Sequence, residues 1–136
     1  MRLRLIATAV LVAASVPAFA LGSTSATTLT TKMSGGVEVP KGSPTGKGTA
    51  RITITGTKVC WKYTFSGIDK PLVSHIHKAP AGKPGPVVVP LGGAFKASGC
   101  TTATAALAKA IAAHPTAYYV NIHTKKYPAG AIRGQL

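Results

Sequence analysis

The sequence predicts an all-β domain: an antiparallel Greek-key sandwich or flattened barrel with one short helix before a C-terminal hairpin. Two observations lead to this fold class. Short segments of alternating apolar and polar residues recur along the chain, and Gly/Pro-rich turns separate them. Only residues 101–113 have helix composition, because they are rich in alanine and place Leu107 and Ile111 on one face before Pro115 ends the segment.

The first expected strand covers residues 29–34, and Val37 and Val39 are expected to extend it beyond a bulge. The clearest hairpin joins residues 50–55 to residues 59–65 through a Gly-Thr turn. We expect the apolar face of this hairpin to form the centre of the core, since large aromatic side chains bury the most area. That face supplies Trp61, Tyr63 and Phe65. Further strands are expected at residues 73–77, 86–91, 94–100, 117–124 and 131–136.

The N-terminal segment is typical of a secretory signal. Residues 1–20 have a basic start, an apolar centre and the small-x-small ending Ala18-Phe19-Ala20. The apolar centre is shorter than the about 20 residues needed to cross a membrane, and no later segment is longer. We therefore expect a signal peptide at residues 1–20, a flexible lead-in at residues 21–28 and one domain at residues 29–136. The mature protein is expected to be secreted or extracytoplasmic, without a transmembrane segment.

The chain is strongly basic, with a formal charge of +14. Loss of Arg2 and Arg4 with the signal would leave a charge that still favours anionic partners, such as extracellular polymers. The lysines are dispersed along the sequence, however, and an ordinary solubilising surface charge is the favoured alternative. Lys125 and Lys126, at the tip of the last hairpin, are the candidate contacts for an anion, with an ordinary solvated turn as the alternative.

Specific nucleic-acid binding is not expected. Such proteins interleave exposed aromatic residues with basic ones. Here the strand alternation places Lys62 on the face opposite Trp61 and Tyr63. The sequence therefore offers no basic stacking platform.

The chain has two cysteines, Cys60 and Cys100. An even number of cysteines in an exported protein favours a disulfide. The alternative, a pair of thiolate metal ligands, lacks the close Cys-x-x-Cys spacing of common sulfur sites.

Three histidines form the candidate site. His75 and His77 share one face of a strand, and His123 follows the alternation that turns Val120 and Ile122 to the core. If the two strands are neighbours, the three imidazoles meet on the outer face and provide an open copper or zinc site for metal storage or redox chemistry. In the alternative, the histidines hydrogen-bond the following Pro/Gly loop back onto the sheet, alongside Asn121 and Arg133. His114 fits a helix cap better than a fourth ligand.

Enzymatic readings have little support. Glu38 and Asp69 are the only carboxylates, so a glycosidase pair would need both of them and a Ser-His-Asp triad would need Asp69. No Gly-x-Ser-x-Gly or phosphate-binding glycine motif is present. An enzyme is therefore less expected than a non-catalytic protein.

Several motifs together resemble the CHRD domain, a family named after the extracellular antagonist chordin. They are Cys60 to Phe65, Ser74-His75-Ile76-His77, Gly82 to Val89, Gly99-Cys100, Tyr119 to Thr124, Pro128-x-Gly130 and Ile132 to Leu136. The resemblance covers residues 29–136 and implies a β-stranded extracellular domain without a settled activity. The growth-factor role of chordin is not transferred, because this chain has none of its other modules. The His-x-His strand also resembles, over two residues, the copper-ligand strand of copper-zinc superoxide dismutases.

The sequence therefore predicts an exported, non-catalytic binding or structural module with an unidentified extracellular partner. A copper or zinc protein with three histidine ligands is the first alternative. A basic protein that associates with anionic extracellular polymers is the second.

Overall fold

A computed structural model describes residues 25–136 of the chain. The predicted signal and residues 21–24 of the predicted lead-in lie outside these described residues, whereas Thr27 and Thr28 of the lead-in belong to the first strand. The described part contains eight strands, one α-helix and two short 3-10 helices. In chain order these are β1 (Thr27–Ser34), η1 (Gly35–Val37), β2 (Lys47–Thr55), β3 (Lys58–Ser66), β4 (Pro71–Lys78), β5 (Val87–Pro90), β6 (Ser98–Thr102), α1 (Ala105–Ala113), η2 (Pro115–Ala117), β7 (Tyr118–Thr124) and β8 (Ile132–Gln135).

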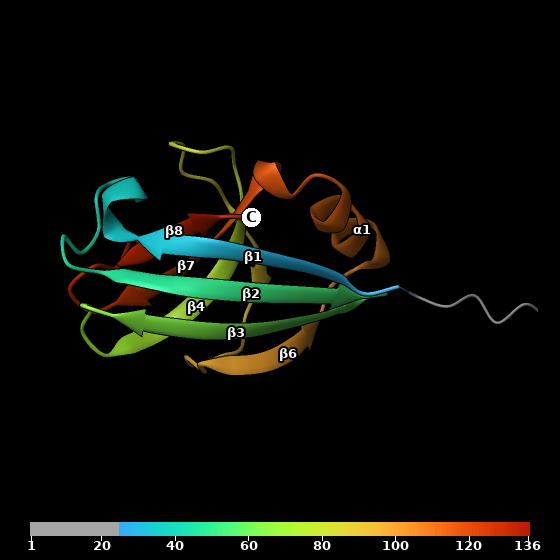
Figure 1. The fold of residues 1–136 in the computed structure, drawn as a ribbon, viewed down its shortest axis with the longest axis horizontal. Coiled ribbons are helices and arrows are strands. Elements are labelled where there is room, and N and C mark those ends of the chain that lie inside the picture. The colour runs from blue at the N-terminus through green and yellow to red at the C-terminus, as the bar shows by residue number, and fades with distance from the viewer. Residues whose placement is uncertain (1–24) are drawn as a thin grey trace, which may run out of the picture.

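The strands form one sheet in the order β5-β4-β7-β8-β1-β2-β3-β6, and every pair of neighbours is antiparallel. The sheet curls into a nearly closed, flattened barrel, with β1, β2 and β3 in front of β4 and β7 and with α1 at one end (Figure 1). The predicted fold class is confirmed. The order also makes β4 and β7 neighbours, although 39 residues separate their nearest ends, Lys78 and Tyr118.

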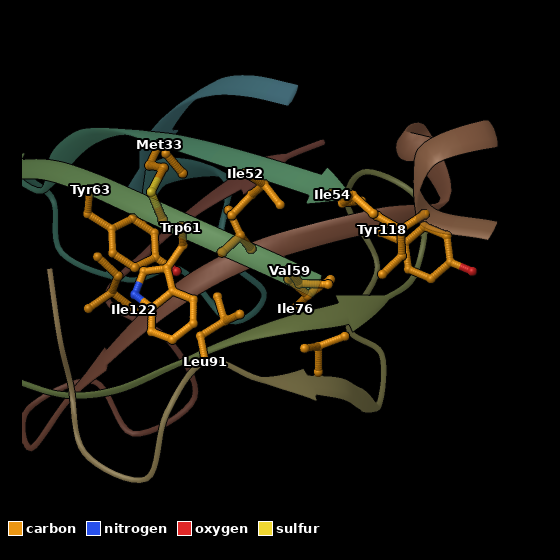
Figure 2. Close-up of a cluster of buried hydrophobic side chains, with 14 of the residues drawn as sticks. Met33, Ile52, Ile54, Val59, Trp61, Tyr63, Ile76, Leu91, Tyr118 and Ile122 are labelled. Carbon is orange, nitrogen blue, oxygen red and sulfur yellow. The ribbon is translucent and has the colours of Figure 1, made fainter. Parts of the chain in front are cut away.

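The core lies between the two halves of the curled sheet. Ile52 on β2 is directly opposite Trp61 on β3, so both side chains point inward together with their alternate neighbours. Figure 2 shows Trp61 and Tyr63 packed in the same cluster as Ile52, Leu91 and Ile122. The indole N–H of Trp61 donates to the Lys96 carbonyl at 2.9 Å, which satisfies its only polar atom. The predicted aromatic core is confirmed, with Phe65 packed at its edge.

The hairpin between β2 and β3 has a two-residue turn. Gly56 adopts a φ of +59°, a conformation that favours glycine. The predicted turn at Gly56 and Thr57 is therefore confirmed, and it fixes which side chains of β2 and β3 face the core.

Most strand ends differ from the prediction by one to three residues, and three segments differ in more than that. The first strand begins at Thr27 and ends at Ser34, and η1 replaces the expected extension, so that Val37 is 53 % exposed. The strand expected at residues 94–100 lies at Ser98–Thr102 because Cys60 and Cys100 are directly opposite each other in the ladder. The helix consequently begins only at Ala105, after Thr104 caps it by accepting the Leu107 N–H.

The disulfide between Cys60 and Cys100 is confirmed. It links β3 to the edge strand β6. Within residues 25–136, no helix has the length and apolar character needed to cross a membrane.

Candidate functional site

His75, His77 and His123 converge on one side of the sheet. β4 and β7 are paired so that Val73 lies opposite His123 and His75 lies opposite Asn121. This register places His123 diagonally beside His75, and Nδ1 of His75 lies 3.1 Å from Nε2 of His123. One ring nitrogen from each of the three histidines lies within 4.8 Å of the other two. Strand alternation predicted that these histidines lie on the side of the sheet opposite the core. This is correct, because Ile76, Val120 and Ile122 are fully buried on the core side.

Backbone carbonyls fix the orientation of two of the imidazoles. Nδ1 of His77 lies 2.9 Å from the Gly85 carbonyl, and Nδ1 of His123 lies 2.9 Å from the Pro128 carbonyl. A carbonyl only accepts, so each Nδ1 donates a proton and each Nε2 keeps a lone pair. Nε2 of His77 is buried and lacks a hydrogen-bond partner among the described residues. In proteins, histidines that bind metals are commonly held by such a contact at the second nitrogen.

The imidazoles favour the neutral form. Burial, followed by the mutual repulsion of His75 with His123 and His77, lowers the pKa of His75 to about 4. Burial also lowers the pKa of His77 and of His123, although their carbonyl contacts oppose this shift. The cluster is therefore uncharged at neutral pH, which is the state in which imidazole binds a metal ion.

Tyr119 connects the histidines to a buried arginine. The His77 ring lies parallel to the Tyr119 ring, with centroids 4.7 Å apart and an angle of 6° between the planes. The Arg133 guanidinium carbon lies 3.4 Å from the centroid of the same tyrosine ring. The packing of a cation on an aromatic face stabilises Arg133 in a position that is only 2 % exposed.

The Pro/Gly loop between β4 and β5 covers this face. Arg133 donates to the carbonyls of Lys83 and Pro80 at 2.7 and 3.1 Å. The Gly85 N–H donates to the Tyr119 hydroxyl at 3.3 Å. The loop therefore covers His77, Tyr119 and Arg133 on this part of the sheet, which strand alternation alone does not reveal. The predicted contacts of His77 and Arg133 with the Pro/Gly loop are present, whereas Asn121 makes none.

Four buried polar residues, His77, Asn121, Arg133 and Glu38, form what we call the polar layer, and the sequence pattern does not predict that Glu38 belongs to it. The carboxyl follows η1, is 4 % exposed, and has one oxygen without a hydrogen-bond partner in the described structure. Burial raises the pKa of Glu38 to about 7, although Asn121 and the positive charge of Arg133 oppose the shift. A side chain at Gly130 would collide with the Glu38 carboxyl. No local signal in the sequence identifies this contact, because the two residues lie in separate loops.

Asn121 lies between Glu38 and His77. It affects the pKa of both groups, yet neither of its amide atoms makes a regular hydrogen bond in the described structure. Asn121 is 1 % exposed. A buried amide without hydrogen-bond partners costs free energy of folding. A further polar group bound beside Asn121 would therefore stabilise the fold.

The remaining candidate residues lie outside the cluster. His114 is exposed at the C-terminal cap of α1, as predicted, and is not one of the three clustered histidines. Lys125 and Lys126 are exposed after β7, and Lys126 Nζ lies 5.6 Å from the Tyr127 ring centroid. Asp69 is also exposed.

A hollow of about 430 Å³ opens beside the histidines. The three histidines form part of its wall, and the apolar side chains of Leu72, Val73 and Val87 form another part. Leu72 and Val87 are about half exposed. The cluster is thus reachable from solvent through an apolar opening.

A family model described as the CHRD domain matches residues 29–136. The match spans the folded part of the chain, including all eight strands except the first two residues of β1. No curated protein and no solved structure matches the chain.

Proposed function

Because the chain belongs to the CHRD domain family, a family of non-enzymatic domains, we propose that it is an exported, non-catalytic module that binds copper or zinc. The ligands are Nε2 of His77, Nε2 of His123 and Nδ1 of His75. The observation that supports this proposal is the convergence of three neutral imidazoles, two of which have Nδ1 bound to a backbone carbonyl.

The distances between the three ring nitrogens suit a metal ion after the imidazoles move slightly closer together. Two nitrogens bound to one tetrahedral ion lie about 3.3 Å apart, and the His75 and His123 nitrogens lie 3.1 Å apart. The widest separation, 4.8 Å, must shorten by about 1.5 Å to reach that spacing. His75 must also move its proton to Nε2, because the proton between His75 and His123 occupies the place of the ion.

The ligand chemistry favours copper and zinc over other common cations. Imidazole nitrogens suit both metals, whereas magnesium and calcium prefer oxygen ligands. Three protein ligands leave a coordination position open, and the apolar hollow beside the cluster gives solvent access to it. The disulfide is consistent with export to an oxidising compartment, where a scavenging or storage module would meet its metal.

The alternative is a purely structural role, in which the histidines hold the Pro/Gly loop on the sheet. His77 contributes to both roles, since its Nδ1 contacts Gly85. A substitution of His75 distinguishes the metal role from the structural role, because its one side-chain hydrogen bond in the described structure is to His123 and not to the Pro/Gly loop. Removal of the His75 imidazole should therefore weaken metal binding at least about tenfold with little loss of stability.

The test is titration of the untagged mature protein with Cu(II) and Zn(II), followed by calorimetry and elemental analysis. We expect one equivalent of metal to bind wild type and the His114→Ala control, and His75→Ala and His123→Ala to bind at least about tenfold more weakly. Melting curves without metal show whether each variant is folded. The metal proposal is wrong if wild type binds no stoichiometric metal, or if His114→Ala and His75→Ala weaken binding equally.

A further inference from the structure

The outward side of β1, β2, β3 and β6 forms a second surface, distinct from the histidine cluster. On β2 the residues between the buried Ala50, Ile52 and Ile54 point outward, and the register extends this alternation to the neighbouring strands. We call this surface the basic face. It contains Thr28, Thr30, Lys32, Ser34, Lys47, Thr49, Arg51, Thr53, Thr55, Lys58, Cys60, Lys62, Thr64, Ser66, Ser98, Cys100 and Thr102.

The fold gathers basic residues that are dispersed in the sequence. Five of the residues on the basic face are basic, and all five are exposed. They are Lys32, Lys47, Arg51, Lys58 and Lys62. Apart from the disulfide, every other member of the face carries a hydroxyl group, and Thr28 and Thr53 lie with their hydroxyl oxygens 3.4 Å apart. In Figure 1 these strands run side by side across the front of the molecule.

Two of these cations lie directly opposite each other. Arg51 on β2 pairs with Lys62 on β3, and their row continues to Thr30 on β1 and Ser98 on β6. Like charges at directly opposed positions destabilise a sheet. No side-chain carboxylate of the described residues neutralises the repulsion between Arg51 and Lys62. Glu38 is buried in the polar layer, and Asp69 lies in the loop after β3, beside Thr45 and Tyr127. An anion bound across Arg51 and Lys62 would remove the repulsion.

A hollow marks one end of the basic face. It has a volume of about 710 Å³. Lys32, Lys47, Thr49 and Thr64 line it together with the apolar side chains of Met33 and Phe65. Val37 on η1 forms part of its rim. The basic and hydroxyl side chains therefore form one continuous surface, and this surface has a depression at one end.

From this arrangement we infer that the basic face binds an extended polymer of phosphate groups that lacks nucleobases, of the inorganic polyphosphate type. Arginine, lysine, serine and threonine are the side chains that bind phosphate oxygens in nucleic-acid complexes. A polymer, rather than a single ion, matches cations spread over three adjacent strands. Exposed aromatic side chains, which single-stranded nucleic acids need for base stacking, are absent from this face in the described structure.

The experiment measures binding of the mature protein to polyphosphate by calorimetry at several NaCl concentrations. Arg51→Gln/Lys62→Gln removes two charges from the centre of the basic face. Lys78→Gln/Lys83→Gln removes two exposed charges from the end of β4 and from the β4–β5 loop, outside the basic face, and serves as the matched control. We expect at least about tenfold weaker binding for the first variant and less than about threefold for the second, with a shallower salt dependence for the first.

Equal weakening by both variants would show that net charge, and not this face, attracts the polymer, and would overturn the inference. Tighter binding of oligouronate or of single-stranded DNA than of polyphosphate would overturn the assignment to phosphate polymers. Melting curves identify any variant that fails to fold. The four substituted residues are exposed, and His75→Ala should bind polyphosphate like wild type, which keeps this test independent of the metal proposal.

Discussion

Nδ1 of His75 lies 3.1 Å from Nε2 of His123, although 48 residues separate them in the sequence. His123 donates its Nδ1 proton to Pro128, so its Nε2 accepts and His75 donates between the two rings. A second proton cannot enter this contact without breaking the hydrogen bond. The pair therefore links the protonation of the cluster to the stability of the fold.

Acid should destabilise the protein through His75. Its pKa is about 4 in the folded protein and 6.5 ordinarily, so the unfolded chain binds more protons between these values. The stabilising contribution is therefore complete above about pH 6.5 and is lost as the pH falls through about 4. We expect His75→Ala to reduce the fall in melting temperature between pH 7 and pH 4. His114→Ala, the control, should keep the full fall. An identical pH profile for His75→Ala and wild type would contradict this prediction.

Glu38→Gln should stabilise the protein at alkaline pH. The pKa of Glu38 is raised from 4.5 to about 7, so its contribution is present below about pH 4.5 and is lost as the pH rises through about 7. At pH 8 the wild type holds a buried carboxylate, and we expect the neutral amide to raise the free energy of unfolding by about 1–2 kcal/mol. Urea denaturation at pH 5 and pH 8 measures this effect. The gain should be smaller at pH 5, and a gain independent of pH would point to packing instead.

Gly130→Ala should be strongly destabilising. Gly130 has a φ of +141°, and its missing side chain leaves space that the Glu38 carboxyl fills. We expect a loss of about 2–4 kcal/mol from strain and displacement of a buried group. Gly93→Ala is the matched control, because a Cβ there meets nothing within 4 Å. Chemical denaturation should show a change below about 0.5 kcal/mol for the control. Similar losses in both variants would argue against the contact with Glu38.

Cys60→Ser/Cys100→Ser should weaken the fold without altering the histidine cluster. The disulfide closes a loop with a sequence separation of 40, and the chain-entropy relation predicts a loss of about 4 kcal/mol. Denaturation of wild type with and without reductant measures the same difference independently. The double variant should be insensitive to reductant, and its metal stoichiometry should equal that of wild type. A variant as stable as oxidised wild type would contradict the prediction.

The sequence alone determined the features that depend on local alternation and on residue type. Strand parity placed His75 and His77 on one face and Trp61 and Tyr63 in the core, because side chains of a strand alternate with a period of two. The turn at Gly56 was also predictable, and so was the pairing of two cysteines in a chain with an expected secretory signal. The motifs spread over residues 29–136 were enough to indicate the CHRD family.

The tertiary structure decided everything that depends on strand order and on loops. The pairing of β4 with β7 brought His123 to His75, and periodicity does not specify strand neighbours. The burial of Glu38 against Gly130 required two loops to meet over one face of the sheet. Likewise, lysines that are scattered in the sequence became one basic face only when β1, β2 and β3 were aligned. Such contacts are long-range, so their residues carry no mark in the local sequence.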